Sequence, residues 1–103
     1  MKHVIQHTLD VATAKKVADR AFAEYRTRYP GYDPVLTWQD DRYAKVRFNA
    51  KGVHLDGGLR IGEKTIEFEL DVPFVFRIFQ KRAIEIVDTE VKVWLEKAKK
   101  GEL

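Results

Sequence analysis

The sequence predicts a two-layer α+β domain of order β-α-β-β-β-β-α, in which a curved antiparallel sheet grips a long C-terminal helix. Three observations support this fold class. Apolar and polar residues alternate over four consecutive segments between residues 35 and 72, as in half-buried strands. Two other segments, residues 11–29 and about 74–100, repeat their apolar residues with the period of a helix. The connections between the strands are short, which favours antiparallel hairpins.

The first two elements are a strand and a helix. Residues 3–9 alternate, and the residues that share one face are His3, Ile5, His7 and Leu9. Asp10 is well suited to cap the helix that follows, because its carboxylate accepts hydrogen bonds from the free amides of a first turn. This helix covers residues 11–29 and ends at Pro30–Gly31. We expect the first strand to pair beside the last one.

Four strands follow as a meander with one apolar and one charged face. Their predicted ranges are Val35–Asp40, Tyr43–Asn49, Val53–Ile61 and Lys64–Val72. Gly57 and Gly58 fall in the middle of the third of these strands, where glycine usually marks a bulge or a bend. We interpret them as the residues that let the sheet curl around a helix.

The C-terminal helix, about Phe74 to Lys100, has an unusually wide apolar arc. The main stripe consists of Phe76, Phe79, Ala83, Val87, Val91, Trp94, Leu95 and Ala98, flanked by Ile84, Ile86 and Val93. These positions span roughly 200°, whereas a surface helix needs only about 100°. The part of the apolar arc that the sheet does not cover faces the N-terminal helix, a cavity or a second subunit. The sequence is therefore compatible with a core shared by the two helices and with a homodimer.

Composition excludes several classes of protein. The chain has 103 residues, enough for one domain, 1–103, with 45% apolar and 34% charged residues. Cysteine and serine are absent, which removes disulfides, thiolate chemistry and serine nucleophiles. No apolar run approaches the ~18 residues of a membrane span, so we expect a cytoplasmic protein. The net charge of +3 is too small to predict a nucleic-acid partner.

Few side chains suggest chemistry. His3 and His7 lie about 13 Å apart on a strand, so they cannot share a metal ion, and we predict neither a metal nor a cofactor. His7 falls on the apolar face and is either a cavity residue or a neutral histidine at the edge of the core. Glu90 falls on the apolar arc of the long helix, where a buried carboxylate would need a partner such as His7 or an arginine.

The predicted layout is similar to a shortened helix-grip fold, as in START-like and Bet v 1-like proteins. Three segments also resemble a known family: residues 7–9, residues 52–57 and residues 79–85. The first segment reads His-Thr-Leu. The second begins with Gly52-Val53 and ends at Gly57, and the third reads Phe-Gln-Lys-Arg-Ala-Ile-Glu. The chain thereby resembles the small bacterial polyhydroxyalkanoic acid system proteins over about Ile5 to Leu95. The resemblance implies a role near polyhydroxyalkanoate storage granules, and it carries over no catalytic residues.

These observations lead to two hypotheses about function. The first is a non-enzymatic protein of the polyhydroxyalkanoate system that contacts a granule, a granule protein or a second copy of itself. The contacts would be made by apolar residues of the long helix, namely Ile78, Ile86 and Val93. The alternative is a binder of a small apolar ligand, such as a hydroxyacyl or fatty-acyl group, in a cavity between sheet and helix. The cavity would be lined by His7, Trp38, Phe68, Glu90 and Trp94. A catalytic version of that cavity would have only His7 and Glu90 as an acid-base pair.

Overall fold

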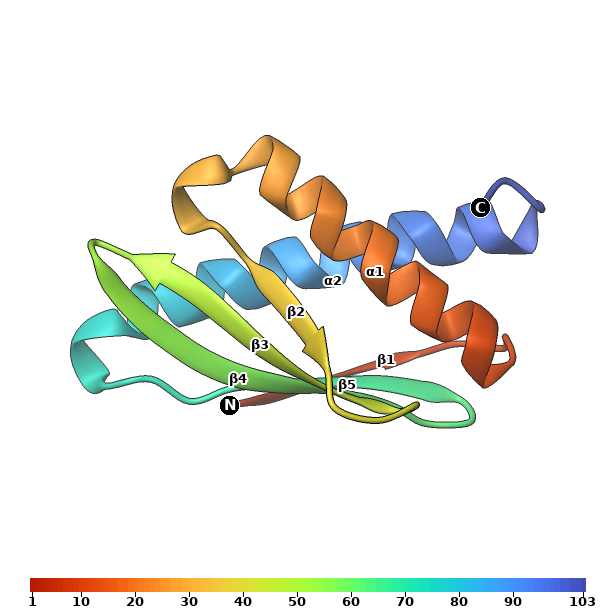
Figure 1. Ribbon diagram of the computed structural model, residues 1–103, viewed down its shortest axis with the longest axis horizontal. Helices are drawn as coiled ribbons and strands as arrows, with labels where there is room; N and C mark the ends of the chain where they lie inside the picture. Colours follow the sequence, from red (N-terminus) through yellow and green to blue (C-terminus); the bar gives the residue numbers. More distant parts are fainter.

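The protein folds as a five-stranded antiparallel sheet with two α-helices, described by a computed structural model for residues 1–103 (Figure 1). The strands are β1 (Lys2–Gln6), β2 (Val35–Trp38), β3 (Tyr43–Ala50), β4 (Val53–Ile61) and β5 (Thr65–Leu70). The helices are α1 (Val11–Arg28) and α2 (Arg77–Lys99), with short 3₁₀ turns η1 (Pro30–Tyr32) and η2 (Phe74–Phe76). The strand order is β1-β5-β4-β3-β2, so every neighbouring pair is antiparallel and β1 returns beside β5. The α+β fold with a long C-terminal helix is therefore confirmed.

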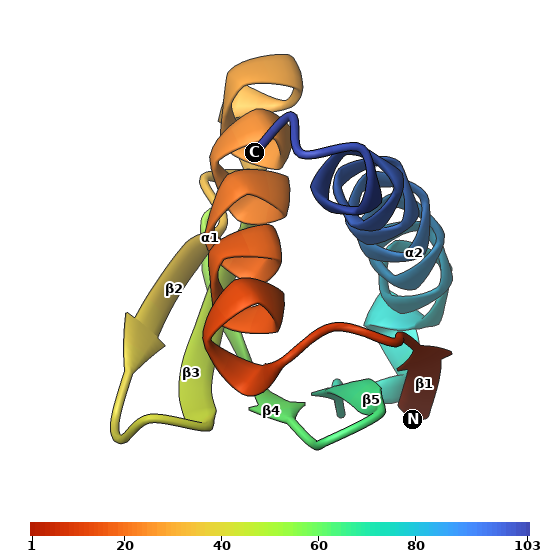
Figure 2. The same cartoon turned by 90° about the vertical axis from the view of Figure 1, so that its right-hand side faces the viewer.

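Both helices lie on the same face of the sheet, side by side (Figure 2). The sheet curves around them, and α1 lies over the β2–β4 side while α2 lies over the β1–β5 side (Figure 2). The long helix is thus not gripped alone, and the two helices share one core. Asp10 caps α1 as predicted, because its carboxylate accepts a hydrogen bond of 2.7 Å from the Thr13 amide.

The ends of several strands differ from their predicted bounds. β1 ends at Gln6 rather than residue 9, so His7 and Leu9 belong to the turn before α1. β2 ends at Trp38, because Asp40 turns the chain by accepting 2.8 Å hydrogen bonds from the amides of Arg42 and Tyr43. Alternation in sequence identifies the face of a strand but not its last hydrogen bond, which depends on the partner strand.

Aromatic rings fill the space between the sheet and the helices. Phe22 of α1 lies 6.3 Å from both Phe48 of β3 and Phe68 of β5, measured between ring centroids. The rings of Phe48 and Phe68 are 6.2 Å apart, and Tyr25 packs on Phe48 at 5.6 Å. All four side chains are at most 2% exposed. The core is therefore centred on α1, β3 and β5, with α2 adding aliphatic residues at its side.

Gly57 and Gly58 allow the sheet to curve at strand β4 without a β-bulge. The register runs unbroken through Gly57 and Gly58, which pair with Leu70 and Glu69 of β5. A Cβ atom on Gly57 would fall far inside van der Waals contact with the carbonyl oxygen of Glu69. Gly57 is thus required because the backbone of β5 approaches β4 closely at this point.

We predict that Gly57→Ala lowers the free energy of unfolding by about 2–3 kcal/mol, because the clash is with backbone rather than with a flexible side chain. Chemical denaturation of the purified variant measures this. Gly31→Ala is the control, since a methyl group at Gly31 meets no atom within 4 Å. Equal stability of the Gly57 variant and the wild type would contradict the close approach of β5.

Candidate functional site

Three large apolar side chains protrude where η2 passes into α2, and we call them the apolar patch: Phe74, Val75 and Ile78. Their exposed fractions are 76%, 81% and 86%, the highest of any large apolar residue in the chain. Single exposed apolar residues are normal on protein surfaces, whereas neighbouring ones mark contact surfaces. The patch lies at one end of the molecule, near the β3–β4 turn (Figure 1).

A groove of about 320 Å³ adjoins the apolar patch, between η2, the start of α2 and the β3–β4 turn. Its lining residues are Tyr32, Ala50, Lys51, Val75, Phe76, Ile78, Phe79 and Arg82. The ring of Phe79 packs edge-on against Tyr32 at 5.2 Å and against Phe48 at 5.8 Å, measured between centroids. Because these rings continue into the core, the groove has a packed floor beneath an exposed apolar rim.

The local sequence explains why these residues point outward. Pro73 is extended, and the Phe76 amide closes a 3₁₀ turn on the Pro73 carbonyl at 2.8 Å. The α-helix therefore begins at Arg77 rather than at residue 74. Gln80 secures this end by donating its side-chain amide to the Leu70 carbonyl. The sequence pattern predicts a helix that already includes Phe74 and Val75, and it does not distinguish them as contact residues.

The three residues predicted to form a contact surface on the long helix have different environments. Ile78 is 86% exposed and belongs to the apolar patch. Ile86 is half-buried and packs against the core. Val93 is 42% exposed and lies further along α2, away from the groove. The exposed apolar surface is thus concentrated at the start of the helix.

His7 is buried, and both of its ring nitrogens are engaged. The Leu9 amide donates to Nδ1 at 3.1 Å, so Nε2 carries the proton and donates to the Gly62 carbonyl at 3.2 Å. His7 precedes the start of α1, whereas Glu90 contacts Arg28 at its end. A helix of 18 residues is about 27 Å long, so His7 and Glu90 are not brought together.

The other predicted cavity residues also lie in separate places. Phe68 is fully buried among the core rings. Trp38 lies on the edge strand β2, where its indole N–H donates to Asp19 at 2.8 Å and Lys15 lies over its ring. Trp94 is half-buried on α2, with the Lys97 ammonium 4.4 Å from its ring centroid. These side chains pack against neighbouring groups rather than around a common space.

Glu90 lies between the two helices and is only 3% exposed. Its Oε2 atom is 3.5 Å from the Arg28 Nε atom, and it has no hydrogen-bond partner. Burial raises the pKa of this carboxyl, and the positive charge of Arg28 opposes that effect without cancelling it. Arg28 itself is largely exposed and shared with Glu24, so the carboxylate is incompletely compensated.

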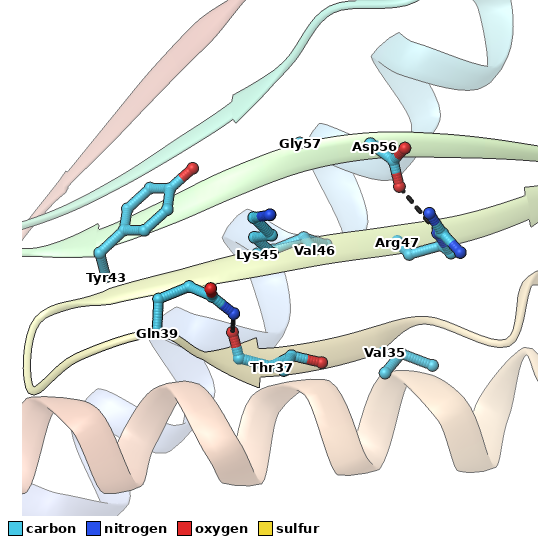
Figure 3. A pocket seen from close by; sticks show the side chains of 9 residues that line it. All are labelled: Val35, Thr37, Gln39, Tyr43, Lys45, Val46, Arg47, Asp56 and Gly57. Carbon is cyan, nitrogen blue, oxygen red and sulfur yellow. Dashed lines mark hydrogen bonds and ion pairs between the residues drawn. The ribbon is translucent and has the colours of Figure 1, made fainter.

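The outer face of the sheet has a second, polar hollow of about 610 Å³ over β2, β3 and β4 (Figure 3). Tyr43, Lys45 and Arg47 project from β3, and Arg47 is tied to Asp56 of β4 at 2.8 Å (Figure 3). The hollow is open and mixed in charge, and it contains none of the residues singled out as chemical candidates. No group of three His, Asp or Glu side chains is arranged to hold a metal ion, and neither helix is long and apolar enough to cross a membrane.

The fold and the site together define a small α+β protein with a packed core and an exposed apolar patch at one end. A family model described as "Putative polyhydroxyalkanoic acid system protein" matches residues 3–95. This match covers most of the chain, so the protein belongs to the polyhydroxyalkanoic acid system protein family. A comparison with curated proteins found no match.

We predict that Glu90→Gln raises the free energy of unfolding by about 1 kcal/mol at neutral pH, because it removes a buried, incompletely paired charge. The folded-state pKa of Glu90 lies above its ordinary value of 4.5, so ionisation destabilises the fold above that pKa. This cost is relieved as the pH falls through the folded pKa. The advantage of the variant should therefore shrink toward zero near pH ~4.

Denaturation curves at several pH values measure this difference. Glu85→Gln is the matched control, because Glu85 is an exposed glutamate of the same helix that forms no ion pair. A Glu90→Gln variant less stable than the wild type at pH 7 would show that the contact with Arg28 outweighs burial.

Proposed function

We propose that the protein is a non-enzymatic component of the polyhydroxyalkanoate system that attaches to the storage granule through the apolar patch. The observation that carries this proposal is the exposure of Phe74, Val75 and Ile78 at one end of the molecule. A polyester granule offers apolar surface, and covering these side chains there removes them from water. Membership of the polyhydroxyalkanoic acid system family supports the setting.

The size of the patch suits reversible attachment. Fully burying a Val, Ile or Phe side chain contributes about 1.5–3 kcal/mol. Three such residues therefore contribute roughly 4–9 kcal/mol before the cost of losing translational and rotational freedom is subtracted. We therefore expect a protein that binds and leaves the granule, with attachment sensitive to each member of the patch.

The surroundings of His7 and Glu90 favour a binding role over catalysis. Both nitrogens of His7 are occupied, and Glu90 faces Arg28 at the far end of α1. An acid-base pair needs both groups within hydrogen-bond reach of one substrate. The alternative of an apolar ligand between sheet and helices has less support, because the rings of Phe22, Phe48 and Phe68 occupy that space.

We predict that the wild-type protein co-sediments with isolated polyhydroxyalkanoate granules, and that Val75→Glu reduces the bound fraction about tenfold. The reason is that a charged side chain replaces one that is removed from water on binding. Val35→Glu is the matched control, because Val35 is 38% exposed on strand β2, away from the patch. Val93→Glu tests whether the apolar surface further along α2 also contributes.

Binding that is absent, or that Val35→Glu weakens as much as Val75→Glu, would overturn granule attachment through the patch. A second copy of the chain is the competing occupant, and analytical ultracentrifugation identifies it. A concentration-dependent dimer that Val75→Glu converts to a folded monomer would assign the patch to self-association instead.

A further inference from the structure

The apolar patch is surrounded by positive charges that have no partners. Lys51 and Arg82 line the groove, and Arg77 lies over the ring of Phe74 with its guanidinium carbon 4.7 Å from the centroid. Lys81 is exposed one turn further along α2. None of these four cations forms an ion pair, and no acidic residue occurs between Asp71 and Glu85. We call Lys51, Arg77, Lys81 and Arg82 the basic rim.

The start of α2 adds to this positive potential. The helix has no side-chain cap and no acidic residue in its first turn, so no carboxylate offsets the positive end of its dipole, although the Arg77 amide is bonded to the Phe74 carbonyl. Arg77 in that first turn opposes the dipole, which is unfavourable for the helix by itself. A local arrangement that costs stability is expected where it serves binding.

The charge of the basic rim exceeds the net charge of the whole molecule. The basic rim carries four positive charges, more than the net charge of +3 of the chain, so the rest of the protein is net negative. Some cations elsewhere on the surface pair with carboxylates, as in Lys2–Glu67, Arg47–Asp56 and Lys92–Asp88. The basic rim is distinguished from these pairs by its position beside exposed apolar side chains, on a helix start that has no acidic residue from 72 to 84.

We propose that this end of the protein binds an anionic lipid surface, with the apolar patch at the acyl boundary and the basic rim at the level of the headgroups. Protruding apolar side chains ringed by Lys and Arg are the combination that interfacial binding requires. The patch protrudes rather than lining a deep pocket, which suits a soft interface better than a rigid partner. The inference rests on the proposed function, because both use the apolar patch as the binding surface. It adds that the surface bound by the patch is an anionic lipid layer.

Co-sedimentation with lipid vesicles tests this proposal. We expect the protein to bind vesicles of equimolar phosphatidylcholine and phosphatidylglycerol, and to bind vesicles of phosphatidylcholine alone far more weakly. Each cation at an anionic surface contributes about fivefold to partitioning, so Arg77→Gln/Lys81→Gln should weaken binding roughly 25-fold. Circular dichroism verifies that the variant is folded. Lys16→Gln/Lys45→Gln is the matched control, because both lysines are exposed, unpaired and away from the patch.

Two results would overturn the inference: no preference for the anionic vesicles, or equal losses in the two double variants. Granule sedimentation separates its failure from that of the proposed function. Granule binding without vesicle binding would leave granule attachment standing, with the polymer or a granule protein as the surface contacted. Vesicle binding without granule binding would support lipid recognition and refute the granule role.

Discussion

The concave face of a single sheet has to cover two helices at once, and most of the structure depends on this constraint. Gly57 lets β5 approach β4 closely enough for the sheet to curve, and α1 and α2 then lie side by side in the hollow (Figure 2). Arg28 at the end of α1 contacts Glu90 of α2. Glu90 lies about 20 Å along the helix axis from Arg77, the first residue of α2. That length of α2 extends past α1. The ring of Tyr32 covers Phe79 there, and the apolar patch beyond it stays uncovered.

The interior and the exposed end have different physical roles. Interlocking rings of Phe22, Phe48 and Phe68 give the core its shape and fill the space where a ligand would otherwise lie. The same ring system reaches the surface through Phe79 and forms the floor of the groove. The groove beside the apolar patch is therefore backed by the packed core.

Two carboxyls of α2 show how partners decide the effect of burial. Burial alone would raise the pKa of Asp88, but hydrogen bonds from His3 and Lys92 outweigh it and lower the pKa. Asp88 thereby stabilises the contact between β1 and α2 above the acidic range. Glu90, two residues along, has only the exposed Arg28 opposite it, and burial dominates. The pKa values of the two carboxyls therefore shift in opposite directions, because Asp88 accepts hydrogen bonds and the buried Oε2 atom of Glu90 does not.

The sequence by itself determined the element types, their order, the apolar faces of the strands and the capping of α1 by Asp10, because these depend on local periodicity and local hydrogen bonding. It also identified the family and the wide apolar arc of the long helix, and Ile78, which it singled out on that helix, is exposed. Only the tertiary structure decided which part of that arc is covered. Whether Ile86 is packed while Phe74 and Val75 are exposed depends on where α1 ends and how the sheet curves, and neither is encoded in the local pattern. The isolation of His7 from Glu90 has the same origin, because their separation is set by the length of the helix between their contacts.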